Sequence, residues 1–133
     1  MAKLSDKQQE FLHNPYVGVV TTIRPDGSPH STVVWVDDPE DGVVSFNTAS
    51  GRRKPANIEQ NPHVSLLVVD PQDAYRWVSI DGTAEITTEG ADPQIDKLAK
   101  KYLGKDEYPW RSASEQRLSV RIRPRHVDAH GLD

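Results

Sequence analysis

The densest group of positively charged side chains lies in the segment Asn47–Lys54, which reads NTASGRRK. Its three consecutive basic residues, Arg52, Arg53 and Lys54, directly precede Pro55, a residue that favours the first turn of a helix. The start of a helix offers unpaired N–H groups and a partial positive charge, and both suit a phosphate. The segment therefore predicts a phosphate site, although a solvated basic turn that binds nothing has the same composition.

Three aromatic side chains occupy positions where a flat ring system can stack. Trp35 lies near the end of one predicted strand, and Tyr75 and Trp77 begin another. Because side chains alternate along a strand, Tyr75 and Trp77 share one face. Aromatic walls of this kind suit ring cofactors, but aromatic residues on strands also fill cores, so both interpretations stay open at this point.

The sequence shows no acid–base motif and no metal-binding motif. Its five histidines have neither HxH nor HExxH spacing, and no Ser–His–Asp order or pair of carboxylates stands out. The chain has no cysteine, which excludes disulfides and thiolate chemistry. We therefore expect no metal site and name no catalytic residue. This pattern is typical of a binding protein, or of an enzyme whose cofactor carries the chemistry.

The elements that position these residues begin with a short helix and a hairpin. The helix is predicted over residues 5–13, with Ser5 as its cap and Gln8 in a weak capping box. β-branched residues predict strands over 17–23 and 30–37. The intervening turn, RPDGS, joins them into the clearest hairpin of the chain.

The middle of the chain predicts three more strands around a helix. A strand over 43–47 leads into the basic segment, and a short helix is predicted over 54–59. Residues 63–69, HVSLLVV, form a nearly continuous apolar run, which predicts a strand buried on both faces. The next strand, over 75–88, contains Gly82, where we expect a bend or a bulge.

The last third predicts one helix and one strand. An amphipathic helix over 92–103 ends at Gly104, an irregular segment follows over 104–116, and a strand over 118–129 closes the pattern. The count is about six strands with helices inserted between them. The predicted fold class is therefore mainly β, a closed or nearly closed barrel.

Length and composition limit the remaining possibilities. A chain of 133 residues is expected to be a single domain, residues 1–133, with an N-terminal helix in 1–15 and the barrel in 16–129. A net charge of −4 weighs against nucleic acid as a partner. No stretch approaches the roughly 20 apolar residues of a membrane span, and the first residues have no apolar signal core. We expect no membrane partner and a cytoplasmic protein.

Four segments of the sequence resemble the pyridoxamine 5'-phosphate oxidase-like split barrels. VGVVTTIRPDGSPHSTVVWV is similar to the opening hairpin of that family, and VVSFNTASGRRKPANIEQNPHVSLLVVD to its strand, basic turn, helix and following strand. YRWVSIDGTAEI resembles a later strand, and VRIRPRHV the closing one. Together they cover most of residues 16–128 in the family's order. The chain is most similar to the flavin/deazaflavin oxidoreductase branch that uses coenzyme F420, because it is short and carries a doubled arginine before Lys54.

The resemblance implies an FMN-binding-type split β-barrel of about six antiparallel strands. It also implies a homodimer with the cofactor in a cleft between the subunits. The basic residues then hold the cofactor phosphate, Ser31–Trp35 run along the ring system, and Tyr75 and Trp77 lie where the partner chain closes the cleft. The implied cofactor-binding residues are Ser31, Thr32, Val33, Val34, Trp35, Asn47, Thr48, Gly51, Arg52, Arg53, Lys54, Asn57, Tyr75 and Trp77.

The function implied by this resemblance is hydride transfer from reduced F420 to an organic acceptor that the sequence does not identify. An FMN-dependent oxidase or reductase of the same fold is an alternative. So is a non-catalytic module that binds a flavin or a tetrapyrrole, because the fold alone does not decide between these functions.

Overall fold

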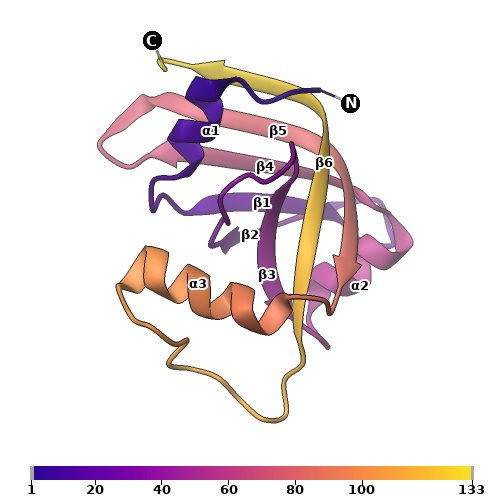
Figure 1. Ribbon diagram of the computed structural model, residues 1–133. Helices are drawn as coiled ribbons and strands as arrows, with labels where there is room; N and C mark the ends of the chain where they lie inside the picture. The colour runs from indigo at the N-terminus through magenta and orange to yellow at the C-terminus, as the bar shows by residue number, and fades with distance from the viewer. Residues whose placement is uncertain (1, 133) are drawn as a thin grey trace.

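Six strands form one antiparallel sheet that curls around a single apolar core, as a computed structural model that describes residues 2–132 shows (Figure 1). One helix precedes the first strand, and two more are inserted between later strands. The elements are α1 (Asp6–Leu12), β1 (Gly18–Ile23), β2 (Pro29–Val34), β3 (Val44–Ala49), α2 (Arg53–Gln60), β4 (His63–Asp70), β5 (Asp73–Thr87), α3 (Ala91–Leu103) and β6 (Arg117–His130). The predicted fold class, a mainly β split barrel of about six antiparallel strands, is confirmed.

The barrel is split because its two edge strands do not pair along their length. The strand order is β2-β1-β4-β5-β6-β3, so β2 and β3 are the edges. They meet through an isolated bridge between Val36, just beyond β2, and Phe46 of β3. The predicted strand over 30–37 therefore ends at Val34, since the chain leaves β1 there and crosses to β3.

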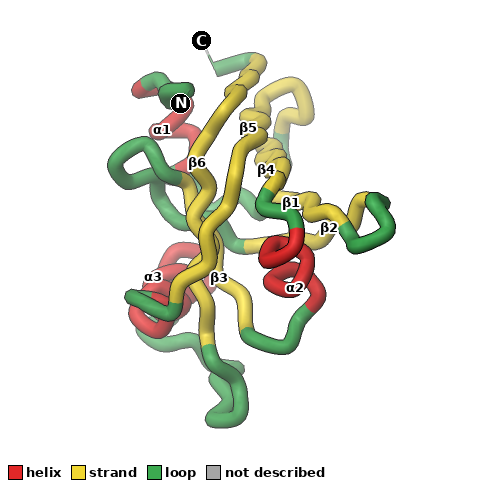
Figure 2. The backbone as a smooth tube through the Cα atoms, turned by 90° about the vertical axis from the view of Figure 1, so that its right-hand side faces the viewer, coloured by secondary structure: helices red, strands yellow, loops and turns green. Residues whose placement is uncertain are grey.

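The core lies inside the curled sheet and includes residues from two of the helices. Phe46, Leu66, Ile80 and Ile122 are among its largest fully buried side chains. The segment that contains α1 adds Leu4, Phe11 and Leu12, and α2 adds Ile58. α3 instead packs against β3 and β6, and Figure 2 shows α2 and α3 on opposite sides of β3. None of the helices described over residues 2–132 is long and apolar enough to cross a membrane.

Most local predictions agree with the structure. Ser5 caps α1 in a complete capping box with Gln8, and the β5–β6 register shifts between Asp81 and Gly82, where a bulge was expected. The prediction of burial for β4 is wrong, because β4 is not buried on both faces. Its side chains alternate, and Leu67 is 38% exposed. The outward-facing side chains of β4, His63 and Leu67, are therefore on the surface.

Candidate functional site

A cavity of about 210 Å³ lies between the end of β2, the outer face of β3, helix α3 and the segment 104–116. It brings together the basic turn, apolar residues of β2 and α3, and an aromatic group. Its lining consists of Val33, Val34, Trp35, Asn47, Arg52, Lys54, Ile95, Leu98, Tyr108, Trp110 and Arg117. Six of these were predicted as cofactor-binding residues: Val33, Val34, Trp35, Asn47, Arg52 and Lys54.

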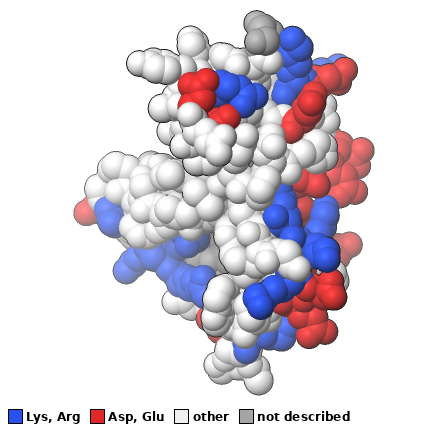
Figure 3. Space-filling model, turned by 90° about the vertical axis from the view of Figure 1, so that its left-hand side faces the viewer, with Lys and Arg blue, Asp and Glu red and all other residues white. Residues whose placement is uncertain are grey.

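Three cations converge on this cavity. Arg52 and Arg117 each form an ion pair with Glu115, at 3.1 and 3.2 Å respectively, so they share one carboxylate. Lys54 pairs with no carboxylate among residues 2–132. Burial, and then the charges of Arg52 and Arg117, lower the pKa of Lys54. The cavity therefore has an excess of positive charge and suits an anionic group. On one side of the molecule, Lys and Arg side chains gather beside a broad uncharged area (Figure 3).

Arg117 is the cation that sequence reasoning missed. It is only 5% exposed, and its Nε donates a hydrogen bond to Oδ1 of Asn47 at 2.9 Å. Its guanidinium also lies over the ring of Tyr108, 5.2 Å from the ring centre. The strand register places it opposite Ala49, near the start of the basic segment. This pairing joins distant parts of the chain. The place of Arg117 in the cavity can therefore be predicted only when the register of β6 against β3 is known.

Asn47 holds Arg117 in place. Its Oδ1 accepts from Arg117, while its Nδ2 donates to the carbonyl of Ala91 at 2.8 Å and to Oε1 of Gln94 at 3.0 Å. Gln94 in turn donates to Ser45 Oγ at 2.9 Å. Both the oxygen and the nitrogen of the Asn47 amide therefore form hydrogen bonds within the protein. We interpret Asn47 as a positioning residue for Arg117.

Aromatic rings form one wall of the cavity. Trp35 stacks on Tyr102 with a centroid separation of 5.4 Å and meets Tyr108 edge-on at 6.1 Å. Tyr108 in turn contacts Trp110 at 5.7 Å, and Trp110 is 63% exposed. Neither Tyr108 nor Trp110 was singled out from the sequence. They lie in the irregular segment 104–116, which carries no periodic signal.

The hydroxyl of Tyr102 fixes the path of the chain at this wall. It accepts from the backbone N–H of Val36 at 3.0 Å and donates to the carbonyl of Tyr16 at 2.7 Å. Burial raises the pKa of Tyr102 to about 12, so the hydroxyl stays protonated at neutral pH. Tyr102 therefore ties α3 to the segment that follows β2 and supports Trp35 from behind.

Five of the other predicted residues do not line the cavity. On β2, the hydroxyl of Ser31 is within 2.8 Å of that of Thr21, and the Oγ1 of Thr32 is buried without a partner. Thr48 and Asn57 are fully buried. Gly51 is exposed in the basic turn with φ of +84°.

Arg53, Tyr75 and Trp77 complete the predicted set. Arg53 is exposed at the first position of α2. Tyr75 is 76% exposed, and Trp77 stacks on His130 with centroids 6.1 Å apart. Strands β1 and β4 separate β5 from β2, so neither aromatic side chain reaches the cavity of its own chain.

The two edge strands and α2 carry buried polar atoms without partners. Four buried polar atoms among residues 2–132 have no hydrogen-bond partner, and all belong to β2, β3 or α2: His30 Nδ1, Thr32 Oγ1, Thr48 Oγ1 and Asn57 Oδ1. Burial, and then the charges of Arg24, Lys54 and Arg53, lower the pKa of His30. As an edge strand, β2 also has backbone N–H and C=O groups on one side without a partner strand.

These residues fit a planar cofactor that carries an anionic group. The cations can pair with the anionic group, and the aromatic and apolar walls can pack against a ring. The free edge of β2 offers hydrogen-bond donors and acceptors in one plane. No group of three or more His, Asp or Glu side chains able to hold a metal occurs within the described part of the chain.

The fold and this cavity define a split β-barrel protein with a cationic, aromatic-walled site beside an edge strand. The sequence profile of the pyridoxamine 5'-phosphate oxidase family matches residues 4–131. The chain belongs to the pyridoxamine 5'-phosphate oxidase family, and the resemblance seen in its motifs is confirmed.

Two relatives with named activities are similar to this chain in sequence. It is 31% identical over 88 residues to the F420H(2)-dependent biliverdin reductase of Mycobacterium tuberculosis, covering 65% of this chain and 62% of that protein. It is 30% identical over 114 residues to the pyridoxine/pyridoxamine 5'-phosphate oxidase of Bacteroides thetaiotaomicron, covering 85% of this chain and 48% of that one. The chain thus spans less than two thirds of either relative.

Solved structures support the same fold. An F420 reductase structure superimposes with a TM-score of 0.80 at 26% identity, covering 94% of this chain and 98% of the other. A conserved hypothetical protein from Mycobacterium tuberculosis superimposes with a TM-score of 0.75, also at 26% identity, covering 97% and 86% of the two chains.

Proposed function

We propose that this protein is an oxidoreductase that binds coenzyme F420 and transfers a hydride from the reduced cofactor to an organic acceptor. The observation that carries the proposal is the convergence of Arg52, Lys54 and Arg117 on one cavity, where Glu115 is the single carboxylate among residues 2–132 that pairs with them. The similarity to an F420H(2)-dependent reductase and to an F420 reductase structure supports the choice of cofactor.

In this proposal the basic turn and β6 hold the anionic part of the cofactor. Lys54 and Arg117 are the principal donors, because their side chains are half-buried and buried at the cavity. Arg52 adds charge from the exposed rim, and Arg53 and Gly51 shape the turn before α2. Each charge-assisted hydrogen bond contributes about 1.5–3 kcal/mol, so two or three of them supply a large part of the roughly 8 kcal/mol that micromolar affinity requires.

The ring of the cofactor lies along Ser31–Trp35 in this proposal, with backbone groups of the β2 edge facing it and Val33 and Trp35 as its walls. When bound, a reduced deazaflavin supplies two electrons as a hydride. Among the described residues that line the cavity there is no histidine and no carboxylic acid. In this proposal the protein contributes binding, orientation and exclusion of water.

A homodimer completes the site in this proposal. Val33, Val19 and Leu67 face each other across β2, β1 and β4 and are all exposed, which leaves an apolar row on the outer face of the sheet. A second copy packed on this row buries it. Tyr75 and Trp77 then serve the partner's cavity rather than their own. Light scattering of Val19→Lys against the unchanged protein tests this, with loss of the dimer as the expected result.

An FMN-dependent oxidase or reductase is the second candidate, favoured by the similarity to pyridoxine/pyridoxamine 5'-phosphate oxidases. The same cations can pair with the phosphate of either cofactor. The discriminating experiment is a fluorescence titration of the purified protein with oxidised F420 and, separately, with FMN. Tighter binding of F420 supports the proposal, and tighter binding of FMN replaces it with the second candidate.

Lys54→Ala provides the internal check, with Lys3→Ala as a matched control because Lys3 is exposed and does not line the cavity. We expect Lys54→Ala to weaken binding of the preferred cofactor at least tenfold and Lys3→Ala to leave it within twofold, by the magnitude of a charge-assisted bond. Binding of neither cofactor refutes the proposal. Tight binding without turnover of any acceptor identifies a non-catalytic binding module.

A further inference from the structure

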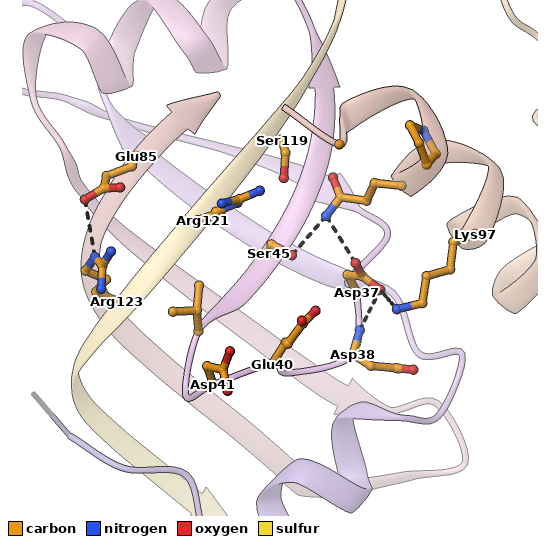
Figure 4. A pocket seen from close by; sticks show the side chains of 14 residues that line it. Asp37, Asp38, Glu40, Asp41, Ser45, Glu85, Lys97, Ser119, Arg121 and Arg123 are labelled. Carbon is orange, nitrogen blue, oxygen red and sulfur yellow. Dashed lines mark hydrogen bonds and ion pairs between the residues drawn. The ribbon is translucent and has the colours of Figure 1, made fainter. Parts of the chain in front are cut away.

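A second cavity, of about 450 Å³, lies beside the amino-terminal half of α3 (Figure 4). It is bounded by the connection between β2 and β3, by the outer face of β3 and β6, and by α3. Its volume falls in the range of small-molecule sites. None of its lining residues lines the candidate cofactor cavity, so it is a separate site.

The charges of this second cavity fall into paired and unpaired groups. Lys97 pairs with Asp37 at 3.0 Å, and Arg123 pairs with Glu85 at 3.3 Å. Arg121, in contrast, pairs with no carboxylate among residues 2–132; its single hydrogen bond is a long one, 3.4 Å, to a backbone carbonyl. Glu40 and Asp41, on the turn before β3, likewise pair with no cation in the described part of the chain.

The unpaired charges of opposite sign lie at different ends of the cavity. Figure 4 shows Arg121 on β6 at one side of the cavity, Glu40 and Asp41 on the turn at the other, and Ser45 between them. The opposite charges do not meet, since Arg121 forms no ion pair with either acidic residue. The cavity is therefore bipolar, with a cationic end and an anionic end.

Ser119 adds an unpartnered hydroxyl to the lining of this cavity. It is 2% exposed, it lines the cavity, and its side chain points into it beside Arg121 (Figure 4). Within residues 2–132 its hydroxyl forms no hydrogen bond, whereas the neighbouring Ser45 accepts one from Gln94 at 2.9 Å. The oxygen of Ser119 is not one of the fully buried unpartnered atoms, so it reaches the cavity and can bond there to a ligand atom in place of water.

We propose that this cavity binds a small zwitterion whose carboxylate meets Arg121 and Ser119 and whose ammonium group meets Glu40 and Asp41. A simple anion fits poorly because the acidic turn repels it, and a simple cation leaves Arg121 and Ser119 unsatisfied. An apolar molecule forms neither hydrogen bonds nor ion pairs with the polar walls. Because Ser45 lies between the two ends, the ligand's charges are separated by a chain, as in an ω-amino carboxylate.

The test is a titration of the isotopically labelled protein, followed by amide NMR shifts, with ω-amino carboxylates from 3-aminopropanoate to 6-aminohexanoate. Butanoate and butylammonium carry one charge each and serve as controls. We expect saturable shifts at residues 40–43 and 119–121 for at least one zwitterion. The singly charged compounds should bind roughly tenfold more weakly, because each makes only one of the two charged contacts.

Variants localise the site. Arg121→Gln and Glu40→Gln should each weaken zwitterion binding about fivefold to tenfold, the range for a partly exposed charged contact. Arg125→Gln makes the same change at an exposed position of β6 outside the cavity. Its affinity for the zwitterion should stay within twofold of that of the unchanged protein. Amide dispersion and melting temperature confirm that each variant is folded. The proposal is overturned by absence of saturable shifts, by equal binding of the singly charged compounds, or by unchanged binding to Arg121→Gln.

Discussion

Replacing Arg117 by methionine separates a binding role from a structural one. Methionine keeps the apolar stem of Arg117 but removes the charge, the bond to Asn47 and the ion pair with Glu115. The lost charge-assisted bond contributes about 1.5–3 kcal/mol and the contact with Tyr108 about 0.5–2 kcal/mol. Relief of a buried charge offsets part of this loss. We expect the free energy of unfolding to fall by about 2–4 kcal/mol.

That loss corresponds to a fall in melting temperature of roughly 7–14 °C for a chain of this length. Circular dichroism during heating measures it. Affinity for the preferred cofactor, F420 or FMN, is then measured by fluorescence at a temperature where Arg117→Met is folded. We expect it to fall by about tenfold to a hundredfold, the equivalent of one charge-assisted bond.

Two further variants identify the cause of the change. Arg117→Lys keeps a charge without the guanidinium, so it should restore part of the affinity but less of the stability. Arg125→Met removes an exposed arginine of the same strand and should change neither quantity. A large fall in melting temperature with unchanged affinity would refute the assignment of Arg117 to the cofactor site. An unchanged melting temperature would refute its role in the buried network.

The remaining predictions concern the scaffold and its pH dependence. Tyr102→Phe leaves the N–H of Val36 without its 3.0 Å partner and should lower the free energy of unfolding by about 1–3 kcal/mol in denaturant titrations; an unchanged value would contradict this. Gly82→Ala places a methyl group 2.1 Å from the carbonyl oxygen of Arg123, so we expect a loss of about 1–3 kcal/mol or more in the same assay. Because the folded-state pKa of His30 lies below its ordinary value, the unfolded chain takes up the proton first, and stability falls as pH drops below about 6.5. His30→Gln should show a smaller fall in melting temperature between pH 8 and 5.5, and an equal fall would show that His30 is not responsible.

The parts of the site that sequence reasoning found are contiguous in the chain. Arg52 and Lys54 stand together before a helix, and Trp35 ends a hairpin strand, so local patterns place all three at the cavity. Arg117 and Trp110 lie far from these residues in sequence and reach them through strand pairing and through an irregular segment. Neither connection leaves a periodic signal.

Strand periodicity accounts for two of the differences. Asn47 and Thr48 are neighbours, so they point to opposite faces of β3, and only Asn47 lines the cavity. The apolar run 63–69 was interpreted as buried on both faces, but only its alternate residues enter the core. Its other apolar residues are explained by an uncovered sheet face, which composition alone does not distinguish from a buried one.

The pairing of β3 with β6 has a consequence for the order of folding. The pair Val44–Ile122 joins positions more than half the chain apart, whereas the β1–β2 and β4–β5 pairs are local hairpins. Closing the long loop costs more chain entropy and slows pairing, so we expect the hairpins to form first and β3–β6 to form last. Because Asn47 meets Arg117 only across that late pairing, the cofactor cavity is assembled at the end of folding. A ligand bound there should therefore slow unfolding while leaving the folding rate nearly unchanged.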